Sequence, residues 1–213
     1  MKEELITRYS KTEEQLNIIT HALGLLLSIA GLPFLIIKAL DFSGFWKPAS
    51  LYIFGISLLV LYTASTCYHA AQQAKLRRRL NIFDHAAIFV LIAGTYTPFT
   101  LIVLDGVVGW LLFGLTWGFA CTGIVLKLFF TGKYDKLSTI MYVLMGWQII
   151  FAIKPLVHNL SSEGLTYLIA GGIFYTIGAV LYSIKKLPFN HAIFHVFVIM
   201  GSLSHFFAIL LYV

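Results

Sequence analysis

Histidines at helical spacing are the residues of this 213-residue sequence that point most directly to chemistry. His191 and His195 are four residues apart, which places both imidazoles on one face of a helix, about one turn from each other. Two histidines at this spacing can bind one zinc ion through single ring nitrogens, although the motif alone is a weak signal. Ser65 and His69 repeat the spacing, so both can face the same point. Three histidines and one open position are typical of a catalytic zinc site rather than a closed structural one.

Asp84 opens another apolar segment and is a second candidate for chemistry. Capping of its own helix is the alternative role, because carboxylates suit helix N-termini. Ser65 can likewise bond back to its own helix. For His21, a hydrogen bond to Asn17 or to a neighbouring segment is favoured over metal binding. His85 lies about 100° around the helix from Asp84 and is not expected to point at the same metal.

The composition indicates which elements must position these residues. Hydrophobic residues make up 59% of the chain and charged residues 11%, and the mean hydropathy is +0.87. A soluble domain carries about 25% charged residues, and a disordered chain would be far less apolar. The apolar stretches are about 20 residues long, which suits membrane-spanning helices and not the shorter strands of a barrel. The sequence therefore predicts an all-α integral membrane protein.

Seven transmembrane helices are predicted, and they form a single membrane domain over residues 1–213 with a short N-terminal tail, 1–15. A cleavable signal peptide is not expected, because the first apolar run is long enough to span the membrane. The predicted spans are Leu16–Leu40, Ala49–Ala71, Ile82–Leu104, Val107–Phe130, Leu137–Val157, Leu165–Ile184 and Phe189–Val213.

The basic residues predict the orientation. Twelve of the 15 Lys and Arg residues fall on one side of the predicted bundle, with Lys38, Lys47 and Lys154 on the other. The positive-inside rule then places the N-terminus in the cytoplasm and the C-terminus outside. All the polar clusters fall in the cytoplasmic third of the membrane under this orientation. The basic residues lie in short loops between the predicted spans, which is the pattern that sets the orientation of a membrane protein. The positive net charge therefore does not indicate a nucleic-acid partner, and none is expected.

At these positions the chain resembles the bacterial hemolysin III proteins, a branch of the PAQR family (progestin and adipoQ receptors). The resemblance covers essentially the whole chain, from Glu14 to Tyr212. The matching residues are Glu14, Asn17 and His21; Ser65 and His69; Asp84; Pro188, His191 and His195; and the stretch 93–99.

The resemblance implies a seven-helix bundle in the bacterial cell membrane that holds one zinc ion near the cytoplasmic face. It implies His69, His191 and His195 as the zinc ligands, with a water completing the site and with Asp84 and Ser65 acting beside it. PAQR proteins are also similar to alkaline ceramidases, which hydrolyse a lipid amide. A membrane lipid is therefore the expected substrate.

The leading functional hypothesis is a zinc-dependent hydrolase of a lipid amide or ester. Zinc lowers the pKa of a bound water to about 7 and polarises a carbonyl. Asp84 would act as the general base, and Ser65 would hydrogen-bond the water or the oxyanion. The alternatives are a membrane sensor or homeostasis protein with structural zinc, a pore-forming cytolysin, and a metal transporter. A divalent metal other than zinc also stays open at this point, although three histidines favour zinc.

Overall fold

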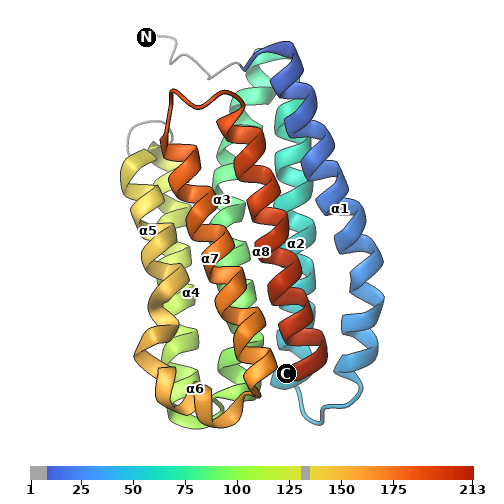
Figure 1. Cartoon of the computed structure of the whole chain (residues 1–213), viewed down its shortest axis with the longest axis vertical. Helices are drawn as coiled ribbons and strands as arrows, with labels where there is room; N and C mark the ends of the chain where they lie inside the picture. The colour runs from blue at the N-terminus through green and yellow to red at the C-terminus, as the bar shows by residue number, and fades with distance from the viewer. Residues whose placement is uncertain (1–8, 131–134) are drawn as a thin grey trace.

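Seven long apolar helices run side by side in this computed structural model, which describes residues 9–130 and 135–213 (Figure 1). The described residues contain helices and no strand. The elements are α1 (Lys11–Ala39), α2 (Trp46–Ala70), α3 (Ala74–Pro98), the π-helical turn η1 (Phe99–Val103), α4 (Gly106–Phe130), α5 (Asp135–Trp147), the 3₁₀ turn η2 (Gln148–Ala152), α6 (Ile153–Asn159), α7 (Ser162–Ser183) and α8 (Asn190–Tyr212). Because α3 continues through η1, and α5 through η2 and α6, these elements make seven spans. The predicted fold class is confirmed.

Lipid-facing apolar side chains distinguish the outer helices from the central one. In the most apolar window of each span, 78% of the α3–η1 residues are buried, against 17% in α7. Leu40 and Phe151 are 76% and 86% exposed, which only a hydrocarbon surrounding makes favourable. The protein is therefore a multi-pass membrane protein with α3 at its centre. The beginning of α1 and the end of α8 lie at opposite ends of the bundle (Figure 1).

Two helices begin at least five residues earlier than predicted. α1 begins at Lys11 and not at Leu16, because the Ser10 side chain accepts a hydrogen bond from the Glu13 backbone N–H and caps the helix (3.2 Å). α3 begins at Ala74 and not at Ile82, so the basic stretch predicted as a loop is helical. Lysine and arginine are good helix formers, and the helix therefore extends beyond its apolar run. The first eight residues of the predicted tail, and Lys133 of the charge count, lie outside the described residues.

The fifth span was predicted as one helix but changes geometry after Trp147, where the 3₁₀ turn begins. A side chain of α3 satisfies the backbone at this change. The Tyr96 hydroxyl donates to the Gly146 carbonyl (2.9 Å) and accepts from the Ile149 N–H (2.9 Å). Irregular backbone is tolerated within a membrane only where neighbouring groups provide such hydrogen bonds.

The turn between η1 and α4 carries an exposed ion pair. Asp105 has a φ of +36° and lies 3.0 Å from the Lys47 ammonium. The Gly106 N–H and then Lys47 hold the pKa of Asp105 below its ordinary value of 3.8. Whatever this pair contributes to stability is present at neutral pH and is lost only as the pH falls through the lowered pKa.

We expect Asp105→Asn to leave the thermal midpoint at pH 7 unchanged, because an exposed ion pair contributes little and asparagine tolerates the same left-handed backbone. Differential scanning fluorimetry in detergent measures this. Asp105→Ala is the matched control, since it removes the same charge but adapts less well to positive φ. A marked fall for Asp105→Asn alone would contradict the expectation.

Candidate metal centre

Three buried histidines from two helices meet near the end of the bundle where α1 begins. His69 comes from the last turn of α2, and His191 and His195 come from the first two turns of α8. The Nε2 atom of His191 lies 3.1 Å from the Nε2 atom of His69 and 3.1 Å from that of His195. Ligand atoms of all three side chains lie within 4.8 Å of one another. The arrangement can hold a metal ion.

The chemistry of this donor set fits a metal better than a set of hydrogen bonds. A neutral imidazole nitrogen carries either one proton or one lone pair. The Nε2 atom of His191 faces two other Nε2 atoms. It can share a proton with only one of them, so the remaining Nε2 atom has no hydrogen-bond partner in the group. Two nitrogens bound tetrahedrally to zinc at 2.0–2.1 Å are about 3.3 Å apart. The two distances of 3.1 Å are close to that separation.

The outer nitrogens of two of these rings are held by residues of α1. The Nδ1 atom of His69 lies 2.7 Å from a carboxylate oxygen of Glu14, and that of His195 lies 3.2 Å from the Thr20 hydroxyl. An acceptor at Nδ1 keeps the proton there and leaves the Nε2 lone pair for a metal. Asn17 lies near the same His69 nitrogen (3.5 Å). The α1 helix thus orients ligands that it does not itself supply.

Glu14 also joins three helices. Its second carboxylate oxygen accepts a hydrogen bond from Arg77 of α3. Arg77 is 5% exposed and donates to the Tyr68 and His69 carbonyls at the end of α2 (3.3 Å each). The carboxylate therefore lies between a metal-binding candidate and a buried cation, and it balances the charge of Arg77.

We expect Glu14→Ala to weaken zinc binding by about 10–100-fold, because His69 loses the acceptor that fixes its ring. It should also lower the free energy of unfolding by about 3 kcal/mol, since Arg77 is left buried without its counter-ion. Chelator competition and thermal denaturation measure the two effects. Glu14→Gln separates them, because it keeps an acceptor for His69 and removes only the charge. Unchanged zinc affinity in Glu14→Ala would contradict this role.

Asp84 and Ser65 lie together beside the three histidines. Both are buried, at 8% and 1% exposure, and the two side chains interact with each other across α2 and α3. The Ser65 hydroxyl makes no regular hydrogen bond within the described residues. Asp84 lies beyond the first turn of α3, which begins at Ala74, so it does not cap that helix. Both side chains line the adjoining cavity and so can reach a group bound there.

The remaining histidines take separate positions. His21 makes no hydrogen bond to Asn17 or to any other described residue, and its ring instead stacks on His195 with centroids 3.4 Å apart. His205 donates from Nε2 to the Leu168 carbonyl (3.0 Å) deeper in the bundle. His85 lines the cavity wall and is absent from the three-histidine group.

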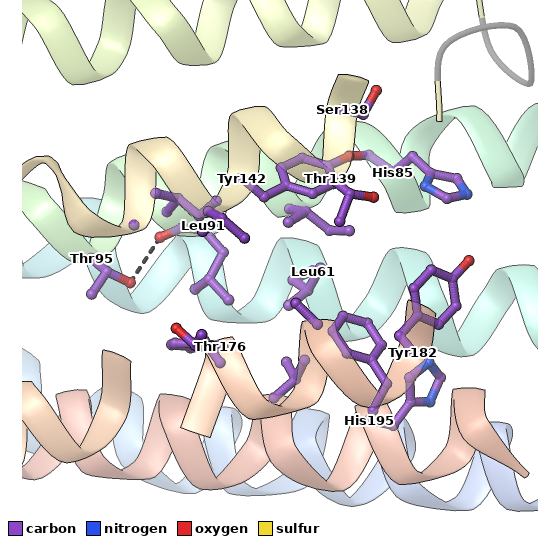
Figure 2. A pocket seen from close by; sticks show the side chains of 18 of the residues that line it. Leu61, His85, Leu91, Thr95, Ser138, Thr139, Tyr142, Thr176, Tyr182 and His195 are labelled. Carbon is purple, nitrogen blue, oxygen red and sulfur yellow. Dashed lines mark hydrogen bonds between the residues drawn. The ribbon is translucent and has the colours of Figure 1, made fainter. Parts of the chain in front are cut away.

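A cavity of about 160 Å³ leads from the histidines into the bundle. Ser65, Asp84, His191 and His195 line one end, and His205 lines the other. His205 lies ten positions beyond His195 in α8, which corresponds to about 15 Å. Figure 2 shows Thr139 and Tyr142 on one wall and Thr176, Tyr182 and His195 on the opposite wall. Apolar side chains such as Leu61 and Leu91 lie between them, so the cavity suits an amphipathic molecule.

Sequence reasoning missed the contributions of Arg77, Thr20 and Tyr9 to this centre. Arg77 was interpreted only as a topology signal, and nothing in a run of basic residues marks the one that folds inward. Thr20 lies three residues after Asn17 and hence on the same helix face, which was an available signal. Tyr9, whose ring stacks on that of His191, gives no sequence signal, because it precedes the first helix.

The fold and the site define a seven-helix membrane protein with a buried three-histidine group. The model of the family described as "Haemolysin-III related" matches residues 9–206, and the chain therefore belongs to that family. It is 48% identical over 200 residues to the hemolysin-3 homolog of Bacillus subtilis (94% of each chain). It is 46% identical over 208 residues to hemolysin-3 of Bacillus cereus, covering 98% of this chain and 94% of that protein.

A more distant relative extends the comparison beyond bacteria. The human monocyte to macrophage differentiation factor is 28% identical over 210 residues, covering 95% of this chain and 86% of that protein. No solved structure was found to match this chain.

Proposed function

We propose that this protein is a zinc-dependent hydrolase of a membrane lipid amide or ester. The observation that carries the proposal is the convergence of three buried histidine Nε2 atoms beside a buried carboxylate, at one end of a largely apolar cavity. His69, His191 and His195 would hold the metal. Three neutral imidazoles favour zinc, which supplies Lewis-acid polarisation of a carbonyl and activation of water.

Two side chains beside the metal-binding histidines would carry out the proton transfer and the hydrogen bonding to the substrate. The Asp84 carboxylate accepts the proton of the attacking water and returns it to the leaving amine or alcohol as the carbonyl–nitrogen or carbonyl–oxygen bond breaks. The Ser65 hydroxyl, which has no regular hydrogen bond of its own, donates to the carbonyl oxygen. The acyl chain lies along the apolar part of the cavity, away from water.

The location follows the charge distribution. The histidines lie near the beginning of α1, at the end of the bundle that carries most of the Lys and Arg residues. The positive-inside rule puts this end in the cytoplasm, so the reaction takes place near the cytoplasmic face of the bacterial plasma membrane. A reporter enzyme fused after Val213 measures the orientation. Activity of a reporter that works only outside the cytoplasm supports the proposal, and activity of one that works only inside it contradicts the proposal.

Elemental analysis of the purified, detergent-solubilised protein is the first test. We expect about one zinc per chain, because the three histidines make one site. A panel of lipid amides and esters then tests turnover by mass spectrometry of released fatty acid, with chelator-treated protein as control. Zinc without turnover of any lipid would overturn the hydrolase and leave a structural metal. Absence of any stoichiometric metal would remove the basis of the proposal.

A further inference from the structure

His191 is the one of the three converging histidines whose outer ring nitrogen, Nδ1, no hydrogen bond orients. Its Nδ1 atom is buried and has no acceptor among the described residues, whereas Glu14 and Thr20 serve the other two rings. A ring that can rotate about its side-chain torsions does not hold a lone pair at a fixed point. Some other contact must therefore set the plane of this imidazole.

An aromatic ring makes that contact. The Tyr9 ring stacks on the His191 ring with centroids 4.8 Å apart and planes 17° apart. Its centroid is 6.0 Å from that of His69. Tyr182 contacts His191 as well, but its ring is tilted by 55° at 5.3 Å and so does not define the plane in the same way. Near-parallel stacking is the contact that fixes ring orientation.

Tyr9 reaches this position from outside the helical bundle. It directly precedes Ser10, the residue that caps α1, so the chain crosses the histidines just before the first helix begins. The ring is half-buried there. Burial raises the pKa of its phenol, and the neighbouring Tyr182 and Tyr68 act in the same direction, so the ring stays neutral at physiological pH.

We propose that Tyr9 is a positioning residue that sets the plane of the His191 imidazole by stacking and covers the outer side of the metal centre. The inference rests on the proposed function, because it assigns Tyr9 a role towards the zinc that His191 would bind. It requires the aromatic ring and not the hydroxyl. Phenylalanine should therefore replace Tyr9, whereas alanine and leucine should not.

The test compares Tyr9→Ala, Tyr9→Leu and Tyr9→Phe. Tyr167→Ala is the matched control, since Tyr167 is also a partly exposed stacked tyrosine (5.9 Å from Tyr212) but lies remote from the histidines. Chelator competition gives zinc affinity, and the visible absorption of the Co²⁺-substituted protein gives ligand geometry. We expect the alanine and leucine variants to bind zinc about tenfold more weakly, with shifted Co²⁺ bands. Tyr9→Phe and the control should match the unmodified protein.

A second measurement does not depend on metal. Diethyl pyrocarbonate modifies accessible imidazoles, and mass spectrometry of the metal-free protein gives the rate at His191. Tyr9→Ala and Tyr9→Leu should raise this rate, while Tyr9→Phe should not. Unchanged zinc affinity and unchanged modification in both variants would overturn the inference, as would equal impairment of Tyr9→Phe. If the unmodified protein binds no zinc, the proposed function fails, and the modification rate alone decides the role of Tyr9.

Discussion

Replacing both His191 and His195 with alanine is expected to abolish stoichiometric zinc binding and lipid hydrolysis together. One imidazole, that of His69, remains, and a single neutral ligand does not hold zinc against the water of the cytoplasm. The loss should be complete, because no other described group of three histidine, cysteine or acidic side chains reaches this point. Elemental analysis and the lipid assay on the same preparation measure both effects.

The control for this double variant is His158→Ala, which removes an exposed histidine of α6. It should keep one zinc per chain and full activity. Size-exclusion chromatography of the double variant shows whether the bundle stays folded, which we expect because α8 keeps its other contacts with α7 and α1. Retention of one zinc per chain in the folded double variant would move the metal site elsewhere.

Asp84→Asn has the second largest expected effect, and it acts on turnover alone. Asparagine has nearly the same shape but cannot accept the proton of water, so the rate should fall by about 10²–10⁴-fold. Zinc content should stay near one per chain, since Asp84 is not among the three converging ligands. Steady-state hydrolysis should therefore be largely lost in this variant while elemental analysis still finds zinc. The double histidine variant should lose both.

Two further changes sharpen the Asp84 experiment. Ser65→Ala should reduce turnover by a smaller factor, because it removes a hydrogen bond and not the base. Asp105→Asn removes a carboxylate at the opposite end of the bundle and should have no effect. Loss of zinc from Asp84→Asn would make Asp84 a ligand and contradict the assigned role, and unchanged turnover would exclude it as the base.

The seven spans could be predicted because hydrocarbon imposes a strong constraint. Every backbone group must be paired inside a spanning segment, so long apolar runs become helices. The ends were harder to predict. Ser10 extends α1 through a cap, and the basic residues after Ala74 extend α3 through their helix propensity, and neither effect changes hydropathy. The change of geometry after Trp147 depends on Tyr96, which is 50 residues away from Gly146 in sequence.

The proximity of the three histidines was also predictable, since i, i+4 spacing and common membrane depth are both visible in the sequence. The residues that surround the three histidines were harder to predict. His21 shares the spacing of a ligand with Asn17, but its ring stacks on His195 and its nitrogens make no hydrogen bond to any described residue. Arg77 and Tyr9 make contacts that depend on how three helices and the residue pair before α1 meet. Periodicity along a single helix carries no information on such contacts.

The dependence of the centre on both ends of the sequence has a consequence for biosynthesis. His69 meets His191 across 122 residues, and Thr20 meets His195 across 175. Chains emerge from the ribosome at about 5–20 residues per second, so α1 waits many seconds in the membrane before α8 arrives. Until then Glu14 and Arg77 have each other and the end of α2 as partners. A chain released before α8 is made lacks two of the three imidazoles. Zinc loading would thus mark the chains whose insertion has reached α8, and an arrested chain should carry none.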